Sequence, residues 1–266
     1  MPAGPETHGF DMRYRALAIA AVLACGTSVI PAQAGQPRAV VELFTSQGCS
    51  SCPPADRLMG QLSRDPSLVA LSLPVDYWDY IGWKDTLALH GHTTRQRAYA
   101  AAHGVGQIYT PQAMINGIED ALGSNRRAIE SAIAQTRRSA GPLALPVSVA
   151  VSGGEISVKV PSASDGHRSG VVWLCPVTSK VSVKIGRGEN RGHTITYYNV
   201  VRRWVKLGEW NGTAQTFRTK LAGLADDRFS LSDVDRLAVL VQSGGASKPG
   251  LMLGAALEPL PASAVR

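Results

Sequence analysis

The sequence predicts an α/β domain followed by an all-β, β-sandwich-like domain. Residues 39–138 alternate short apolar runs with helical patterns, whereas residues 146–261 show short alternating runs broken by Gly, Ser and Asn. The segment GPLALP at 141–146 forms the seam between these two patterns. We therefore divide the chain into three parts, at residues 1–34, 35–141 and 142–266.

The first part, residues 1–34, has the features of a secretory signal peptide. MRYR at 12–15 supplies positive charge, residues 16–30 an apolar centre, and PAQA at 31–34 a small-residue cleavage pattern. We take Met12 as the start of the signal and Gly35 as the start of the mature chain, which predicts a periplasmic or secreted protein. Two alternatives stay open: lipidation of Cys25 within the pattern VLAC, and an uncleaved anchor.

Residues 35–141 are expected to alternate strands and helices. Apolar runs predict strands at 39–44 and 68–75, and apolar residues at helical spacing predict a helix over 55–62. A second helix is expected over 92–103, where Thr93 and Gln96 have capping-box spacing, and a third follows Ser124 as its N-cap. Before it, residues 113–118 predict a hairpin with a type I′ turn at Asn116-Gly117.

Residues 142–266 are expected to form strands. The clearest are two alternating runs, at 147–151 and 156–160, which flank a turn at Gly153-Gly154. Apolar runs predict further strands, at 171–174, 181–185, 194–201, 237–242 and 251–257. This series of short strands suggests a β-sandwich.

The motif CSSC at 49–52 follows a predicted strand and precedes a predicted helix. Two intervening residues in a turn bring both sulfurs within disulfide distance, and a C-x-x-C in this context indicates redox chemistry. We expect Cys49 to be the nucleophile and Cys52 to resolve the mixed disulfide. The two prolines that follow move the start of the regular helix to about Pro53. A structural disulfide and half a site for Cu(I) or Zn are the alternatives.

Residues 76–83, with the sequence DYWDYIGW, contain four aromatic and two acidic side chains, although the whole chain has only 7 Tyr and 5 Trp. One hypothesis is that this loop forms a wall of the cysteine pocket and binds an apolar or extended peptide. The substrate-binding candidates are then Tyr77, Trp78, Trp83 and Tyr109. The alternative is a core-packing loop that covers a sheet edge.

Four further residues or segments are weaker candidates for a functional role. Glu42 is a candidate proton relay, and the histidines of HGH at 90–92 form only a weak metal pair. The Gly-rich loop at 186–192 is expected to dock on the first domain, and Cys175 to be a buried single thiol. We predict no metal and no cofactor.

Composition narrows the possible partners. The 266 residues carry a net charge of +7, are 44% hydrophobic and 18% charged, and place their basic residues in scattered pairs. Scattered charge argues against nucleic acid as a partner. Outside residues 1–34 there is no apolar run of about 18 residues, so we expect no membrane association beyond the signal.

The segment VELFTSQGCSSCPP at 41–54 resembles the active-site segment of thioredoxin and glutaredoxin-like proteins. Tyr109-Thr110-Pro111 resembles their second hallmark, a cis-proline loop that faces the cysteine pair. The resemblance implies that Thr110 and Pro111 belong to the catalytic site. If Pro111 is cis, its loop lies against Cys49, and the backbone of Thr110 is free to pair with a substrate strand.

The longer motifs FTSQGCSSCPPAD, VDYWDYIGWKD, RQRAY, YTPQAMING, RGENRG and YYNVVR resemble an exported bacterial family with a thioredoxin-like fold, domain of unknown function 1223. The likeness covers residues 38–257, and implies a thioredoxin-like domain followed by a β-rich region, without an established substrate. Pro74 stands where histidine is expected, and Thr86-Leu87 stands where Pro-Phe is expected.

We therefore predict an exported thiol–disulfide oxidoreductase that acts through Cys49 and Cys52. Its expected partner is an unidentified periplasmic protein or a low-molecular-weight thiol or disulfide. The alternatives are a non-catalytic binding module and a copper-handling C-x-x-C protein.

Overall fold

The computed structural model describes residues 1, 3–4, 36–139, 141–164, 168–261 and 264, and the fold below belongs to the unit that spans residues 34–266. The predicted signal peptide, with its start at Met12, the alternative lipidation site Cys25 and the cleavage point before Gly35, lies outside the described residues. No helix in the described ranges is long and apolar enough to cross a membrane.

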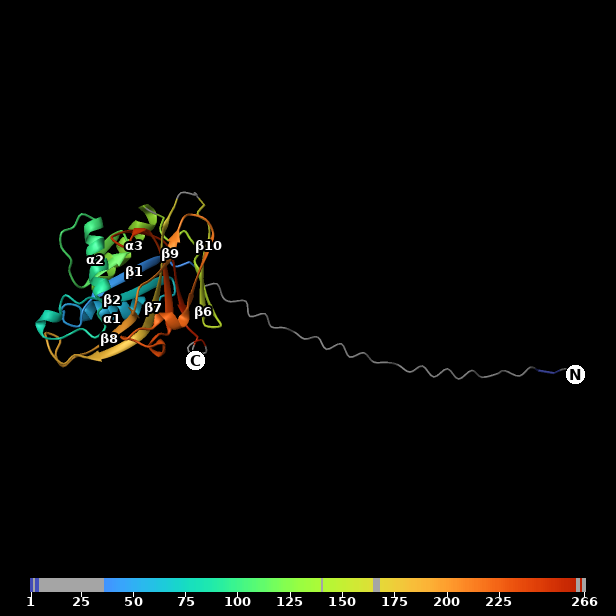
Figure 1. Ribbon diagram of the computed structural model, residues 1–266, viewed down its shortest axis with the longest axis horizontal. Helices are drawn as coiled ribbons and strands as arrows, with labels where there is room; N and C mark the ends of the chain where they lie inside the picture. Colours follow the sequence, from blue (N-terminus) through green and yellow to red (C-terminus); the bar gives the residue numbers. More distant parts are fainter. Residues whose placement is uncertain (2, 5–35, 140, 165–167, 262–263, 265–266) are drawn as a thin grey trace. The chain divides into compact units, whose positions relative to one another are not determined.

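A mixed nine-stranded sheet forms the body of the described fold (Figure 1). Its main path runs β12-β11-β7-β8-β2-β1-β3-β4, and β9 pairs with β7 beside this path. The strands are β1 (Ala39–Thr45), β2 (Leu68–Pro74), β3 (Gln112–Ile115), β4 (Glu119–Leu122), β7 (Gly170–Lys184), β8 (Thr194–Val201), β9 (Val205–Trp210), β11 (Arg236–Gly245) and β12 (Lys248–Pro259).

A smaller sheet has the order β10-β6-β5, with β5 at Ser148–Ser152, β6 at Glu155–Val160 and β10 at Gln215–Lys220. Three α-helices occur in the described ranges: α1 (Pro53–Leu62), α2 (His90–Ala102) and α3 (Arg126–Ser139). Single 3₁₀ turns lie at Asp79–Ile81, Leu221–Leu224 and Leu231–Asp233.

The predicted fold class, an α/β thioredoxin-like domain followed by a separate all-β domain, is wrong. Strands from both halves of the chain join in one sheet, because β8 pairs in parallel with β2. Two side chains reinforce this junction: Ser72 donates to the Tyr198 carbonyl at 2.7 Å, and Asn199 donates to the Ala70 carbonyl at 2.8 Å. Periodicity reveals which residues form a strand, but not which strands become neighbours.

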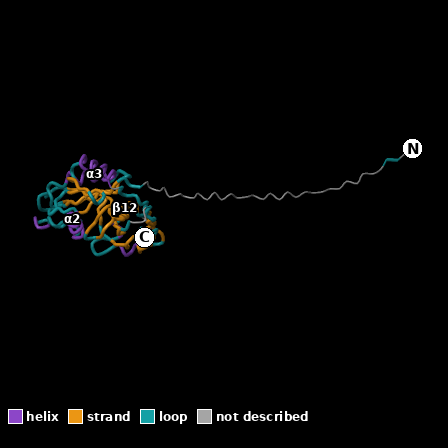
Figure 2. Tube along the Cα trace, turned by 90° about the horizontal axis from the view of Figure 1, so that it is seen from above, coloured by secondary structure: helices purple, strands orange, loops and turns teal. Residues whose placement is uncertain are grey.

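Side chains of β1 alternate between two apolar clusters on opposite faces of the sheet. Val40 and Phe44 pack in the cluster that contains Tyr99 of α2, whereas Val41 and Leu43 pack with α1 and α3. A strand covered on both faces is mostly apolar, and every residue of β1 is buried, including Glu42 and Thr45. Figure 2 accordingly shows α2 and α3 on opposite sides of the strands.

The small sheet covers one face at the far end of the large sheet. Apolar residues of β6 pack in one cluster with Leu174 of β7 and Val239 of β11. The hairpin predicted around Gly153-Gly154 is confirmed, and both glycines have positive φ, as a tight hairpin turn requires. The all-β region therefore packs sheet on sheet, although one of its sheets continues into the first half of the chain.

Local predictions succeed where the pattern is strong and fail at the starts of two helices, α2 and α3. The turn at Asn116-Gly117 is confirmed by positive φ at both residues. The capping-box prediction is wrong, because α2 begins at His90 with Leu89 as its N-cap. For α3, the Asn125 side chain accepts from the Ala128 N–H at 3.1 Å, and thus caps the helix in place of Ser124. The strands predicted at 171–174 and 181–185 belong to one strand, β7. Strands β9 and β10 were not predicted from the sequence.

Candidate functional site

The cysteine motif occupies the turn between β1 and α1, and its two cysteines form a disulfide with a Cα–Cα distance of 5.4 Å. As the two prolines suggest, α1 begins at Pro53 and Cys52 is its N-cap residue. Cys49 is 1% exposed and Cys52 is fully buried. The serines between them are exposed, so the motif shows its backbone and hydroxyl groups to solvent and keeps its sulfurs beneath.

The loop at Thr110 faces the disulfide. The Thr110–Pro111 peptide bond is cis, and the Thr110 carbonyl oxygen lies 3.8 Å from the Sγ of Cys49. The Ser51 hydroxyl lies between these groups, at 3.3 Å from the same sulfur and 3.5 Å from the same oxygen. The structure therefore brings the four predicted catalytic residues together. Cys49 and Cys52 form the disulfide, and Thr110 and Pro111 lie in the loop that faces it. Their catalytic roles stay predictions.

The aromatic loop that follows β2 packs against the same turn. Trp78 donates from Nε1 to the Thr110 hydroxyl at 2.8 Å, and Trp83 donates from Nε1 to the Gln47 side-chain oxygen at 2.8 Å. A Cβ added to Gly48 would lie 3.0 Å from the Cβ of Trp78, so this position favours glycine. These two tryptophans pack against the cysteine turn and the Thr110 loop, so the aromatic loop borders the cysteine site. Binding of an apolar or extended peptide by this loop stays a prediction.

The remaining aromatic candidates differ in exposure. Tyr77 is partly buried and packs against Trp78 with a centroid distance of 6.4 Å. Tyr109 is 39% exposed and donates to the Asp120 carboxylate at 2.8 Å. Tyr80, which was not among the candidates, is 82% exposed and stacks on Trp78. The exposed aromatic surface near the disulfide is therefore carried by Tyr80 and Tyr109.

The Gly-rich loop at 186–192 docks on the cysteine turn, as predicted. The Asn190 amide donates to the backbone carbonyls of Gln47 and Cys49, both at 2.9 Å. The Glu189 carboxylate accepts from the Ser50 N–H at 3.2 Å. A Cβ on Gly186 would lie 2.8 Å from the Trp83 ring, so glycine lets this loop approach the aromatic loop closely.

Sequence reasoning missed Asp85 and Gln47. Asp85 is buried and accepts from the backbone N–H of Gln47 at 2.7 Å and of Leu87 at 2.8 Å; burial raises its pKa to about 6. The Gln47 side chain donates to the Thr86 hydroxyl at 3.1 Å. A lone carboxylate 38 residues from its partner leaves no pattern along the chain, so no sequence signal could have identified this contact.

Asp56 is a second buried carboxylate near the cysteines. It lies in the first turn of α1, accepts from the Thr45 hydroxyl at 2.8 Å, and has a pKa raised by burial to about 8. Its Oδ2 has no hydrogen-bond partner within the described residues. A signal was available here, because Asp56 stands three residues before Met59 and hence on the apolar side of the helix.

Glu42 does not contact the cysteine turn. Its carboxylate accepts from Arg95 Nε at 2.7 Å and from the Tyr99 hydroxyl at 2.6 Å, and Arg95 also donates to the Gln242 side chain at 2.9 Å. Arg95 lies 4.2 Å from the ring centroid of Trp204. This buried network joins β1, α2 and β11, so Glu42 has a structural role.

The other sequence candidates are also accounted for. His90 is exposed and pairs with Asp76, whereas His92 is buried and bonds through Nδ1 to the Pro74 carbonyl at 2.8 Å. Within the ranges that the structure describes, no group of three or more His, Cys, Asp or Glu side chains is placed to hold a metal ion. Cys175 is a free, fully buried thiol on β7, as predicted.

Comparison with known proteins gives a family profile and two similar structures. The profile described as "Protein of unknown function (DUF1223)" matches residues 40–242. A crystal structure of a protein from Agrobacterium tumefaciens is similar at 32% identity and a TM-score of 0.73, over 84% of this chain and 94% of that chain. HBP35 of Porphyromonas gingivalis shares the fold at 13% identity and a TM-score of 0.52, over 85% and 76% of the two chains. No curated protein matches.

Proposed function

This chain belongs to the family of unknown function DUF1223, and from that premise we propose that it is an exported thiol–disulfide exchange protein that works through Cys49 and Cys52. The proposed partner is a periplasmic or secreted protein, or a low-molecular-weight thiol or disulfide. Export and partner rest on the signal-like sequence at 12–34, and the chemistry rests on the disulfide and its surroundings.

The span of the disulfide carries the proposal. The two cysteines are three positions apart, so the bridge closes one of the shortest loops available to the chain. A cross-link stabilises a protein by lowering the entropy of its unfolded chain. For a loop of four residues this effect is worth about 2 kcal/mol, compared with about 4.7 kcal/mol for a loop of 100 residues. A bridge that adds so little to stability is better explained by its chemistry.

The surroundings of the bridge support the same conclusion. Two separate loops hold the site: Asp85 and Asn190 bind a backbone N–H and two carbonyls of the turn, and Trp78, from the same loop as Asp85, binds the facing Thr110 loop. This preorganisation is what an exchange site needs, because the attacking sulfur must meet a partner disulfide in a fixed direction. A simple four-residue clip needs no such support.

The proposed reaction follows from thiol chemistry. In the reduced protein, the Cys49 thiolate attacks one sulfur of the partner disulfide, whose S–S bond breaks and releases a partner thiolate. The Cys52 thiolate then attacks the Cys49 sulfur, forms the intramolecular disulfide and releases the second partner thiolate. Two electrons pass to the partner, and the reverse sequence oxidises a partner dithiol.

The burial of both sulfurs favours a second candidate function, a binding module with a structural disulfide. Cys49 is only 1% exposed, so a partner sulfur must displace the groups that cover it, among them the Ser51 hydroxyl. In this alternative, the exposed rings of Tyr80 and Tyr109 bind a protein or ligand without exchange.

A redox titration separates the two functions. The protein is equilibrated in glutathione buffers and its free thiols are alkylated. Mass spectrometry then measures the fraction of molecules in which the Cys49–Cys52 pair is reduced. An exchange-competent pair is expected to titrate above about −300 mV, whereas a structural bridge stays oxidised below that potential. Failure to reduce the bridge across the glutathione range would overturn the exchange proposal and leave the binding module.

Trapping variants test the assignment of the two cysteines. With Cys175→Ala as the common background, Cys52→Ala is expected to accumulate a mixed disulfide with the partner, because the resolving thiol is missing. Cys49→Ala is expected to accumulate little. If both variants capture no more than the double variant that lacks Cys49 and Cys52, then the chain does not exchange disulfides in this way.

A further inference from the structure

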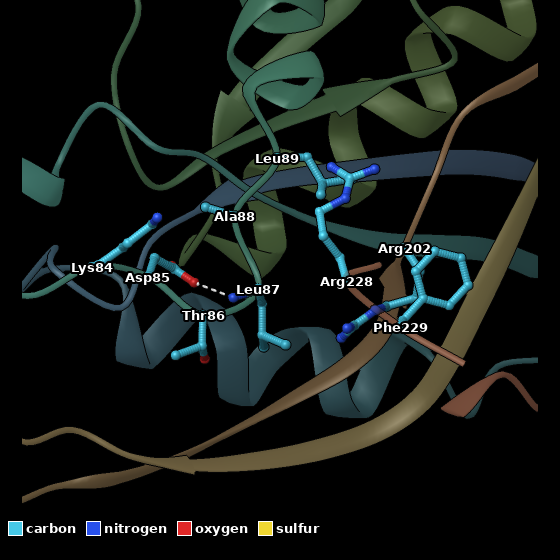
Figure 3. Close-up of a pocket in the computed structure, with 9 residues that line it drawn as sticks. All are labelled: Lys84, Asp85, Thr86, Leu87, Ala88, Leu89, Arg202, Arg228 and Phe229. Atoms are coloured by element: carbon cyan, nitrogen blue, oxygen red, sulfur yellow. Dashed lines mark hydrogen bonds between the residues drawn. The ribbon is translucent and has the colours of Figure 1, made fainter. Parts of the chain in front are cut away.

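A cavity of about 460 Å³ lies between the loop at residues 84–89 and a wall formed by Arg202, Arg228 and Phe229 (Figure 3). Its volume is within the range of small-molecule sites. The two arginine side chains reach toward the 84–89 loop from the opposite wall (Figure 3). Nothing in the exchange chemistry of the cysteines uses this cavity.

Among the residues that line the cavity, Arg202 gives the strongest indication of a ligand. It follows β8, is half-buried, and lies 5.6 Å from the ring centroid of Phe229. Its guanidinium makes no hydrogen bond to any residue in the described part of the chain. Its pKa is lowered, chiefly by burial; the charge of Asp233 partly offsets this effect, and the charge of Arg228 adds to it. A half-buried guanidinium beside a like charge is stabilised when an anion occupies the space in front of it.

The other charges around the cavity nearly balance. Arg228 pairs with Asp226 at 2.6 Å, and Lys84 shares the loop wall with Asp85. Asp233 acts on Arg202 through space, although it lies outside the cavity wall and accepts from the Ser230 N–H. The three cations Lys84, Arg202 and Arg228 therefore lie near three carboxylates, Asp85, Asp226 and Asp233, but none of these carboxylates is hydrogen-bonded to Arg202.

Apart from the exposed Thr86, the rest of the wall is apolar. Leu87 and Phe229 are buried, and Ala88 and Leu89 are partly buried. Such a surface gains free energy when it contacts hydrocarbon, but it offers nothing to a small hydrated anion. The cavity therefore combines a guanidinium that has no hydrogen-bond partner among the described residues with a mainly apolar lining.

From this combination we propose that the cavity binds a monocarboxylate with a short apolar body. The carboxylate lies against the Arg202 guanidinium, whose planar fork matches two carboxylate oxygens. The hydrocarbon body lies against Leu87 and Phe229. A single carboxylate matches the one guanidinium that lacks a hydrogen-bond partner.

Three probes test the proposal in calorimetric or NMR titrations at fixed ionic strength. Hexanoate carries both features, acetate only the charge, and 1-hexanol only the hydrocarbon. Saturable hexanoate binding is expected, at least about tenfold tighter than binding of either fragment, because losing the charged hydrogen bonds or the burial of several CH₂ groups costs this much or more. Hexanoate that does not saturate, or that binds no better than 1-hexanol, overturns the proposal.

Matched variants locate the site. Arg202→Gln is expected to weaken hexanoate binding about tenfold or more, whereas Arg97→Gln, which removes an exposed charge on α2, leaves it within about twofold. Equal effects of the two variants mean non-specific attraction and overturn the proposal. If Arg202→Gln does not fold, amide shifts in the unmodified protein decide: changes confined to residues 84–89 and 228–229 support the site, and changes elsewhere refute it.

Discussion

Replacing Asp56 with asparagine is expected to stabilise the protein at neutral and alkaline pH. The carboxyl is 1% exposed, one of its oxygens accepts from Thr45 at 2.8 Å, and the other has no partner in the described residues. Burial, with a smaller contribution from the nearby charge of Asp85, raises its pKa to about 8. Asparagine has the same shape and can still accept from Thr45, but it never needs to be ionised in a buried position.

The sign and size follow from proton linkage. The unfolded chain loses the Asp56 proton near pH 4, whereas the folded protein keeps it until about pH 8. Between these values the folded state binds more protons, so the free energy of unfolding falls by up to about 1.4 kcal/mol per pH unit. The loss reaches on the order of 4 kcal/mol at pH 7 and about 5 kcal/mol above pH 8. Below pH 4 this contribution vanishes.

The assay is urea unfolding of the unmodified protein and of Asp56→Asn at several values from pH 4 to pH 9. The two unfolding free energies should converge at the acid end and separate steadily as the pH rises, with the variant more stable. Asp227→Asn is the matched control, because it removes one carboxylate at an exposed position. Parallel pH profiles, or a variant that is less stable at pH 8, would refute the reasoning.

Three further predictions concern the supports of the fold and site. Glu42→Gln should cost about 3–5 kcal/mol in urea unfolding, because it leaves the buried Arg95 charge uncompensated; a cost below 1 kcal/mol contradicts this. Asn190→Ala should speed reduction of the disulfide by dithiothreitol severalfold, because two carbonyls of the cysteine turn lose their donor; an unchanged rate means the loop does not hold the turn. The thiol of Cys175, whose pKa burial raises, should resist iodoacetamide at pH 8 in the native protein and react after unfolding; rapid native labelling contradicts its position.

The features that the sequence predicted are local in origin. The strand at 39–44, the helix start at Pro53 and the hairpin turn at Asn116-Gly117 each depend on residues within a few positions of one another. The C-x-x-C disulfide has the same basis, because two intervening residues place both sulfurs in one turn. Such features can be predicted from the sequence, because the interactions that create them join residues only a few positions apart.

Some long-range contacts also left a trace in the sequence. The Gly-rich loop around Asn190 was expected to dock, because it concentrates charge and glycine on an otherwise regular β region. The aromatic loop was recognised for its density of rings, but only the structure distinguished the fixed Trp78 from the exposed Tyr80. Exposure depends on what a distant segment covers, and composition does not contain that information.

By itself, the sequence determined most of the elements, the family motifs and the cysteine pair at which we place the chemistry. Only the tertiary structure decided that β8 joins β2 in one mixed sheet, because strand pairing is selected by burial and by contacts across more than a hundred residues. It also placed Asp85 against the cysteine turn and Arg202 opposite the 84–89 loop. A single charged residue forms no periodic pattern in the sequence, so only the folded structure shows which distant residue it contacts.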